Sequence, residues 1–288
     1  MSDPVPPAVS VIVPVYADWD RVPLLLGALA AQTWTDFELL LVDNGPEPWP
    51  GPLRSPVQRT RLVHCPQKGS YAARNAGAAE ARGEVLAFTD SDCLPSPGWL
   101  AGLMAARRDV PELLAGPVEI RPGPRPNPWE IFDTVRGIPQ KSFIRHGYAA
   151  TANLSLPRGV FAALGGFDAT RLSGGDAEFC RRARTQGHPL RYVPDAVVDH
   201  PARASRQELV TKARRIKGGQ VAAGPLRRRV FWTVRSLCPP LREIAAYVVS
   251  SHPLGWRLTA SAVRLRLWGV EIEELVRLLV LRQTPERR

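Results

Sequence analysis

The feature that most constrains the fold is an alternation of short apolar runs with helix-like segments in the first third of the chain. The first run is rich in β-branched residues, too short for a typical helix and apolar on both faces, as in a central parallel strand. The runs cover residues 9–16, 37–42, 61–65 and 85–89. Helical segments at 21–32 and 71–81 separate them. This alternation predicts an α/β fold with a doubly wound, mostly parallel central sheet flanked by helices.

The remainder of the chain is less regular. Proline-rich segments at 46–56 and 117–128 predict loops. Further along, the pattern favours a strand at 149–156, a helix at 176–186 and a strand at 191–198, with no internal repeat. From about residue 205 the sequence is mostly helical and rich in arginine. We therefore expect one α/β domain over residues 1–204 and a basic helical extension over residues 205–288.

Bulk properties exclude several classes of protein. With 288 residues and 44% hydrophobic composition, the chain can bury a large core, which excludes a disordered protein. The first residues lack a basic and apolar signal sequence, and no stretch approaches eighteen uninterrupted apolar residues. We expect a cytoplasmic protein, either soluble or peripheral at the inner face of the membrane. The four cysteines have no zinc-ligand spacing, and we expect them to be reduced and structural.

The positive charge is concentrated at the end of the chain. Residues 1–200 hold 20 Lys and Arg against 21 Asp and Glu, whereas residues 201–288 hold 18 against 6, an excess of +12. Such a tail could meet nucleic acid, anionic lipid, a phosphorylated acceptor or an acidic face of its own protein. No helix-turn-helix or aromatic-basic RNA motif is present, so we expect no nucleic acid partner.

Acidic residues follow the predicted strands. Asp43 ends the second strand, Asp90 and Asp92 follow the fourth, and Asp176 precedes the late helix. The carboxyl ends of strands in a doubly wound sheet converge on one crevice. Two carboxylates there repel each other unless a cation neutralises them, and a diphosphate would add negative charge. The alternative is that Asp90-Ser91-Asp92 only turns the chain and caps the next helix.

Seven segments in fixed order carry a family resemblance. They are 9–16 (VSVIVPVY), 41–45 (LVDNG), 73–77 (ARNAG), 83–92 (GEVLAFTDSD), 165–168 (GGFD), 174–178 (GGDAE) and 198–200 (VDH). In order and spacing they resemble the family 2 glycosyltransferases of the GT-A fold, over roughly residues 9–200. The resemblance implies a nucleotide-sugar half at about 9–92 and an acceptor half at about 93–204.

The resemblance also implies which residues bind the donor. The nucleotide pocket would be lined by Pro14, Tyr16, Asp43 and Arg74, with the Asp43 carboxylate on the base. The DXD motif would be Asp90-Ser91-Asp92. Asp92 would ligate a divalent cation, Mn²⁺ or Mg²⁺, and His200 stands where the family often supplies a second ligand. A lone His after a strand is also an ordinary structural residue, and both interpretations of His200 stay open.

On the acceptor side, the resemblance makes Asp176 the general base of an inverting transfer. Asn153, Gly175 and Glu178 would lie on the acceptor side. Asn153 and the glycines at 165–166 fit a tight acceptor-side loop, and a plain turn without a role in binding is the alternative. Gly175 departs from the family, where Glu is usual. An Asp before a helix is also a common N-cap, and Glu178 could complement the helix dipole.

The expected activity is therefore transfer of a sugar from a nucleoside-diphosphate-sugar, with a UDP-sugar as the favoured donor. The acceptor would be a hydroxyl of a glycan, a lipid-linked sugar or a small molecule. One alternative is a catalytically silent nucleotide-sugar binding or scaffold protein. Another is a nucleotidyltransferase, but that class needs a glycine-rich basic loop after the first strand, where residues 14–17 read PVYA.

The tail combines arginine with tryptophan. Residues 227–229 are three arginines followed by Phe231 and Trp232, while Trp256 and Trp268 lie among further arginines. This combination suits a peripheral membrane contact. The last helix, predicted at 270–281, has acids in its first turn, which suit the helix dipole. The alternative is that these helices pack on the catalytic domain or on the second subunit of a homodimer.

Overall fold

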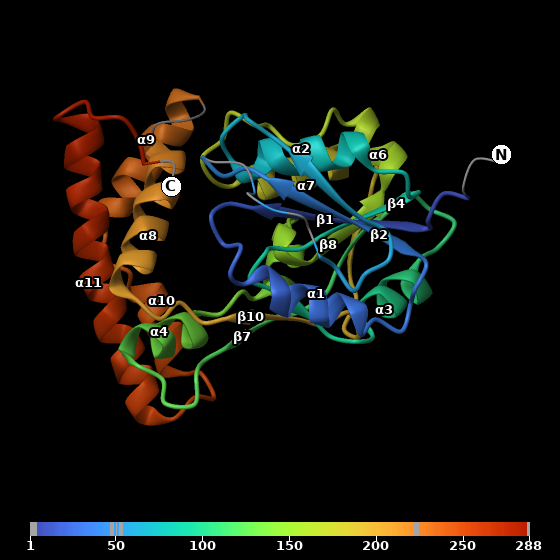
Figure 1. The fold of residues 1–288 in the computed structure, drawn as a ribbon. Helices are drawn as coiled ribbons and strands as arrows, with labels where there is room; N and C mark the ends of the chain where they lie inside the picture. Colours follow the sequence, from blue (N-terminus) through green and yellow to red (C-terminus); the bar gives the residue numbers. More distant parts are fainter. Residues whose placement is uncertain (1–4, 47–48, 50, 52–53, 222–224, 287–288) are drawn as a thin grey trace. The chain divides into compact units, whose positions relative to one another are not determined.

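The computed structural model describes residues 5–46, 49, 51, 54–221 and 225–286. Part of the proline-rich segment 46–56 therefore lies outside the described residues. The chain divides into two compact units (Figure 1). The first unit contains Met1–Glu119, Ile138–Ala169 and Gly175–His200, and the second contains Ile120–Gly137, Thr170–Gly174 and Pro201–Arg288. The second unit thus includes residues 120–137, 170–174 and 201–204, which the family resemblance assigned to the acceptor half.

The first unit is built on a seven-stranded sheet in the order β3-β2-β1-β4-β8-β6-β9. Its strands are β1 (Val9–Val15), β2 (Phe37–Asp43), β3 (Thr60–His64), β4 (Val85–Phe88), β6 (Leu113–Ala115), β8 (Leu154–Pro157) and β9 (Leu190–Tyr192). β8 runs antiparallel to β4 and β6, and the other pairs are parallel. The predicted α/β fold with a mostly parallel sheet is confirmed.

Helices cover both faces of this sheet, because alternate residues of the central strands bury on opposite sides. In β1, Val11 and Val13 pack against α1 (Val22–Ala30) and α3 (Trp99–Ala106). Ile12 belongs to the other core, with α2 (Ser70–Glu80), α6 (Arg158–Ala163) and α7 (Gly175–Thr185). Figure 1 shows the two groups on either side of the strands. A short helix, α5 (Gln140–Arg145), completes the helices of this unit.

Two predicted strands differ from the structure. The strand expected at 149–156 begins as a 3-10 helix, Thr151–Asn153, and only then becomes β8. The single strand expected at 191–198 is wrong, because β9 ends at Tyr192 and β10 (Val198–Pro201) is a separate strand that pairs antiparallel with β5 (Leu94–Pro95). Pro194 lies in the break, and proline cannot donate to a strand ladder. β7 (Val118–Arg121) runs from the first unit into the second.

Asn153 anchors several chain segments in the core of the first unit. Its side chain is fully buried and donates to the carbonyls of Pro117 at 2.9 Å and Ala196 at 2.7 Å. Its Oδ1 accepts a hydrogen bond of 2.9 Å from the indole of Trp99. These bonds join α3 to the chain after β6 and the turn before β10. The side chain predicted to lie on the acceptor side is thus placed among protein groups.

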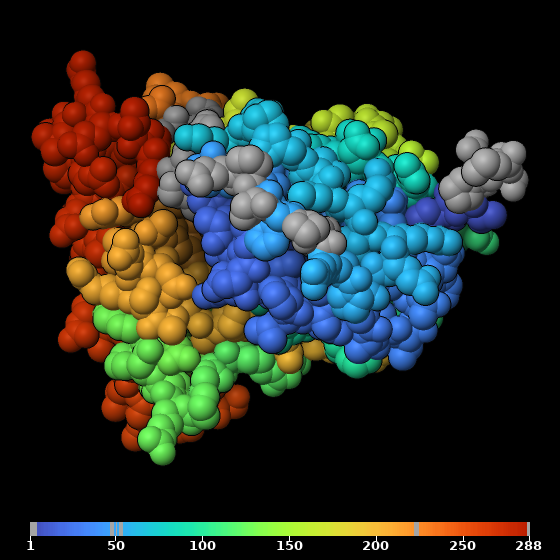
Figure 2. Space-filling model, viewed as in Figure 1, coloured from blue at the N-terminus to red at the C-terminus, as the bar shows by residue number. Residues whose placement is uncertain are grey.

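The second unit is helical. It contains α4 (Pro128–Arg136), α8 (Arg206–Val221), α9 (Leu226–Leu237), α10 (Leu241–Val248) and α11 (Leu254–Leu279). Its core is formed by Phe132, Leu209, Tyr247, Ala260, Val263 and Leu267. In Figure 2 the surfaces of α4 (green) and α8 (light orange) lie side by side. α11 begins well before the predicted residue 270, because apolar residues recur at helical spacing from Ala260 onward.

No helix among the described residues has the length and apolar character needed to cross a bilayer.

The buried network around Asn153 predicts a stability effect. Asn153→Ala removes the partner of the Trp99 indole and of the Ala196 carbonyl, while the Pro117 carbonyl keeps the N–H of Val198, so we expect the free energy of unfolding to fall by about 3 kcal/mol. Urea denaturation followed by tryptophan fluorescence measures the change. The matched control is Gln186→Ala, which truncates an exposed amide and should change stability by less than about 0.5 kcal/mol. Equal stability of the two variants would contradict the structural role of Asn153.

Candidate active site

The polar residues of the site follow the carboxyl ends of three neighbouring strands. β1 pairs with β2 on one side and β4 on the other, all parallel, so their ends open on one edge of the sheet. Pro14 lies within β1 and Tyr16 directly after it, and both are partly buried. Asp43 ends β2, and Asp90 follows β4 shortly after Phe88. The sheet topology therefore brings the residues predicted to bind donor to one edge.

The Asp43 carboxylate organises the loop that follows β2. Only 1% of the residue is exposed, and its oxygens accept hydrogen bonds from the backbone N–H of Gly45 (3.1 Å) and of Trp49 (2.8 Å). The ring of Trp49 lies 4.6 Å from that of Trp19, centroid to centroid. This aromatic pair beside Asp43 was missed at the level of sequence, because its two members belong to different loops. The predicted contact of Asp43 with a base stays a prediction.

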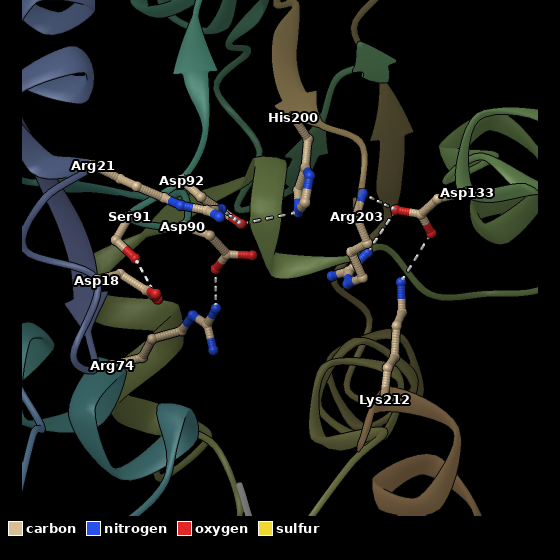
Figure 3. Close-up of polar contacts among 10 residues, drawn as sticks. All are labelled: Asp18, Arg21, Arg74, Asp90, Ser91, Asp92, Asp133, His200, Arg203 and Lys212. Atoms are coloured by element: carbon tan, nitrogen blue, oxygen red, sulfur yellow. Dashed lines mark hydrogen bonds and ion pairs between the residues drawn. The ribbon is translucent and has the colours of Figure 1, made fainter. Parts of the chain in front are cut away.

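Two ion pairs hold the acidic loop after β4 (Figure 3). Arg74 of α2 is almost fully buried, and its Nη2 donates to Oδ1 of Asp90. Arg21 lies 3.6 Å from Oδ2 of Asp92, measured from Nη1. Ser91 donates to Oδ2 of Asp18 at 3.5 Å. Arg74 was predicted as a donor-binding residue, whereas Arg21 and Asp18 were not, because no motif marks them.

His200 approaches the same loop from β10. Its Nε2 lies 3.6 Å from Oδ2 of Asp92, and Figure 3 shows the imidazole pointing at that carboxylate. One ligand atom from each of Asp90, Asp92, Cys93 and His200 fits within 4.8 Å of the others. Burial, with the charges of Asp90 and Asp92, raises the pKa of the Cys93 thiol well above its ordinary value. Two carboxylates and an imidazole are a donor set that suits Mn²⁺ or Mg²⁺.

Asp176 lies in the first turn of α7, where the backbone N–H of Ala177 donates to its Oδ1 at 2.9 Å. The Tyr71 hydroxyl of α2 also donates to Oδ1, at 3.4 Å, and accepts a hydrogen bond of 2.9 Å from the N–H of Gly175. Burial raises the pKa of Asp176, against the opposing effects of Ala177 and Arg74. Burial also raises the pKa of Tyr71, so its hydroxyl keeps the proton that it donates.

The Tyr71 ring explains why residue 175 is glycine. A Cβ atom on Gly175 would lie 2.7 Å from two ring carbons of Tyr71, closer than any real contact of this kind. A glutamate at this position, as in the family's usual motif, would therefore displace the tyrosine. Residue 175 therefore has no side chain. The Tyr71 hydroxyl, on α2, donates a hydrogen bond to Asp176 instead.

Glu178 acts on the neighbouring turn through an arginine. Its carboxylate accepts from Nε of Arg182 at 2.9 Å, one helical turn away. Arg182 in turn donates to the carbonyl oxygens of Leu164 and Gly166. Gly165 and Gly166 both have φ near +70°, a region that favours glycine. Glu178 thus supports the tight turn that the sequence predicted at 165–166.

The contact between residues 71 and 175 yields a stability prediction. Gly175→Ala forces the new methyl group against the Tyr71 ring and should lower the free energy of unfolding by about 1–3 kcal/mol. Combining it with Tyr71→Ala should cost less than the sum of the two single changes, because the clash disappears. Urea denaturation of the four proteins closes this cycle. Strict additivity would show that the contact does not constrain residue 175.

Comparisons with known proteins identify the family of this chain. The family model described as glycosyl transferase family 2 matches residues 10–167, more than half of the chain. Among curated proteins, glycosyltransferase AglE of Haloferax volcanii is 33% identical over 78% of this chain and 78% of its own length. The pre-mycofactocin glycosyltransferase of Mycobacterium tuberculosis is 29% identical over 75% of this chain, which spans only 47% of that protein.

Solved structures support the fold. A mannosyltransferase from Pyrobaculum calidifontis, determined with GDP-Man and Mn²⁺, superposes with a TM-score of 0.60 at 18% identity, covering 96% of this chain and 88% of that one. The S. aureus TarS fragment determined with UDP-GlcNAc gives 0.51 at 15% identity, covering 93% and 72%. The solved structures show the fold, whereas the matched family model and the identity with AglE show the family. They show that this chain belongs to glycosyl transferase family 2 and is a glycosyltransferase of the GT-A fold.

Proposed function

We propose that this enzyme moves a sugar from a nucleoside-diphosphate donor to a hydroxyl acceptor, with inversion at the anomeric carbon and with a divalent cation. The observation that carries the proposal is the convergence of Asp90, Asp92 and His200 on one point at the carboxyl edge of the sheet. A UDP-sugar is the donor we favour. The solved relatives of the same fold were determined with GDP-Man or UDP-GlcNAc, so both bases belong in the test.

On the donor side, the chain's own residues would hold the diphosphate and the cation. Asp92 and His200 are the proposed metal ligands. Asp90 is already paired with Arg74 and would act mainly by orienting that arginine toward the donor. When bound, the cation supplies positive charge to the departing diphosphate. Pro14, Tyr16 and Asp43 would form the wall of the nucleoside pocket.

On the acceptor side, Asp176 is the proposed general base. Among described residues, the hydrogen bonds to this carboxylate fall on Oδ1, which leaves Oδ2 for the acceptor hydroxyl. A raised pKa makes Asp176 a stronger base than an exposed aspartate. As the acceptor oxygen attacks the anomeric carbon, its proton moves to Asp176 and the bond to the diphosphate breaks on the opposite face.

Substitution of the carboxylates tests the proposal directly. Asp176→Asn should lower kcat for transfer by about 10²–10⁴-fold while donor still binds. Asp92→Asn should weaken metal-dependent donor binding. Release of UDP or GDP is measured across donors and acceptors with and without EDTA. The control, Asp109→Asn, changes an exposed aspartate and should keep wild-type rates.

The same assay separates the enzyme from a silent binding protein. A wild-type chain that binds donor with metal but never releases the nucleoside diphosphate, even by slow hydrolysis, and that behaves like Asp176→Asn, would contradict catalysis. Analysis of the product anomer by NMR decides between inversion and retention.

The hydrogen bond from Tyr71 predicts a pH effect. The bond stabilises the ionised form of Asp176, so its loss in Tyr71→Phe raises the pKa of Asp176 further. Because a general base works only when deprotonated, the acidic limb of the kcat/KM profile should move to higher pH. Tyr192→Phe removes a tyrosine hydroxyl from β9 and is the matched control. An unchanged acidic limb in Tyr71→Phe would exclude this role of the hydroxyl.

We also propose that the second unit contacts an anionic membrane surface. The helix α9 exposes Leu226, Val230, Phe231, Val234 and Leu237, each by more than half of its surface. The residues after 200 carry an excess of +12, which complements anionic lipid.

Sedimentation with vesicles tests the membrane contact. The protein should bind vesicles containing phosphatidylglycerol more than neutral ones, and Phe231→Ser should weaken this binding. Leu24→Ser, an exposed position on α1, should leave it unchanged. Equal binding to neutral and anionic vesicles would contradict the contact.

A further inference from the structure

The second unit contains a cavity of about 310 Å³ that is separate in its lining from the residues of the sheet edge. Residues of α4, α8, α9, α10 and α11 form its walls. The volume lies at the lower end of the range typical of small-molecule sites, roughly 300–1,000 Å³. The cavity is lined by five cationic side chains and two carboxylates: Arg136, Lys212, Lys217, Arg235, Arg264, Glu243 and Glu271.

The two carboxylates of the wall form ion pairs with two of its cations, Arg264 and Lys217. Arg264 pairs with Glu243 and, at 3.1 Å, with Glu271. Lys217 lies 3.2 Å from Glu271 and donates to the hydroxyl of Ser236 at 2.7 Å. This pairing leaves Arg136 and Arg235 as the excess positive charge of the wall, while Lys212 pairs with Asp133.

Lys212 and Arg203 both pair with the carboxylate of Asp133. The buried carboxylate of Asp133 accepts from Nη1 of Arg203 at 3.0 Å and lies 3.8 Å from Nζ of Lys212, as Figure 3 shows. Burial lowers the pKa of Lys212 well below its ordinary value, and the charges of Arg136 and Arg203 add to this effect. The basic side chains of Lys212, Arg203 and Arg136 thus lie near one buried carboxylate, and a bound anion would favour the protonated form of Lys212.

Arg136 and Arg235 are the two remaining cations, and the charge of Arg136 contributes to the lowered pKa of Asp133. The side chains of Arg136 and Arg235 form neither a hydrogen bond nor an ion pair within the part of the chain that the structure describes. Gln220, also in the wall, has a buried Oε1 without a hydrogen-bond partner. Rotating its amide by half a turn would present an N–H to an anion instead.

We propose that this cavity binds the phosphate group of an organic phosphate. Arginine guanidinium groups match the geometry of phosphate oxygens, and Arg136 and Arg235 are the available forks. Trp232 and Trp268 add apolar surface to the same wall, which suits an organic group attached to the phosphate. The source is either a soluble phosphate ester or a lipid headgroup.

Isothermal titration of the full chain in EDTA tests the site. The probes are inorganic phosphate, glycerol 3-phosphate and dihexanoyl phosphatidic acid, with dihexanoyl phosphatidylcholine as the lipid that lacks net charge. The three anionic probes should bind the wild type, and phosphatidylcholine, whose phosphate charge is balanced by choline, should not. Arg136→Gln should weaken binding of the anionic probes about tenfold, because one charge-assisted pair is lost. Arg242→Gln removes an exposed arginine of α10 outside the cavity and should change nothing.

The lipid probe identifies the source. Phosphatidic acid that binds at least tenfold more tightly than glycerol 3-phosphate assigns the cavity to a lipid headgroup, and equal affinities assign it to a soluble ester. If Arg136→Gln unfolds, Arg235→Gln at an exposed position of α9 takes its place. Absence of binding by every anionic probe, or equal affinities in wild type and both variants, overturns the proposal.

Discussion

Repulsion between carboxylates is the constraint around which the catalytic unit is arranged. Asp90 and Asp92 both follow a buried strand, and an oxygen of each lies within 4.8 Å of one of the other, so the two carboxylates repel each other. The chain supplies positive charge through Arg74 on α2 and Arg21 before α1, and the imidazole of His200 on β10 lies beside Asp92. The positions of these elements follow from the sheet order, so the fold and the electrostatics of the site depend on each other.

In the second unit the charges that repel each other are positive. Its sequence carries an excess of arginine, and its buried carboxylates Asp133 and Glu274 pair with Lys212 and Arg214 of α8. Tyr247, in the core of that unit, has its pKa raised to about 12 by burial and therefore stays neutral. Because the acids are fewer than the bases, pairing within this unit is incomplete. The remaining positive charge is what distinguishes the cavity from an ordinary gap between helices.

Much of the fold could be predicted from sequence, because strands buried on both faces must be apolar throughout and helices between them keep a helical spacing. The positions of Asp43, Asp90 and Asp92 follow from the same argument. Asn153 could not be placed this way: its partners, Trp99, Pro117 and Ala196, are distant in sequence and belong to different elements. The break in the strand after Tyr192 was not predicted. The apolar residues around Pro194 favoured one continuous strand, although a proline interrupts strand pairing.

The pairing of Tyr71 with Gly175 has a consequence for how such a site can change over generations. A relative that carries an acidic side chain at 175 cannot keep a tyrosine in this position, since ring and side chain would occupy the same space. The two residues can therefore be replaced only together. Replacing residue 175 alone creates a steric clash, and replacing Tyr71 alone leaves an unfilled space beside Gly175. Residues 71 and 175 are distant in sequence but must change together. The pair determines from which helix the Asp176 carboxylate receives a side-chain hydrogen bond.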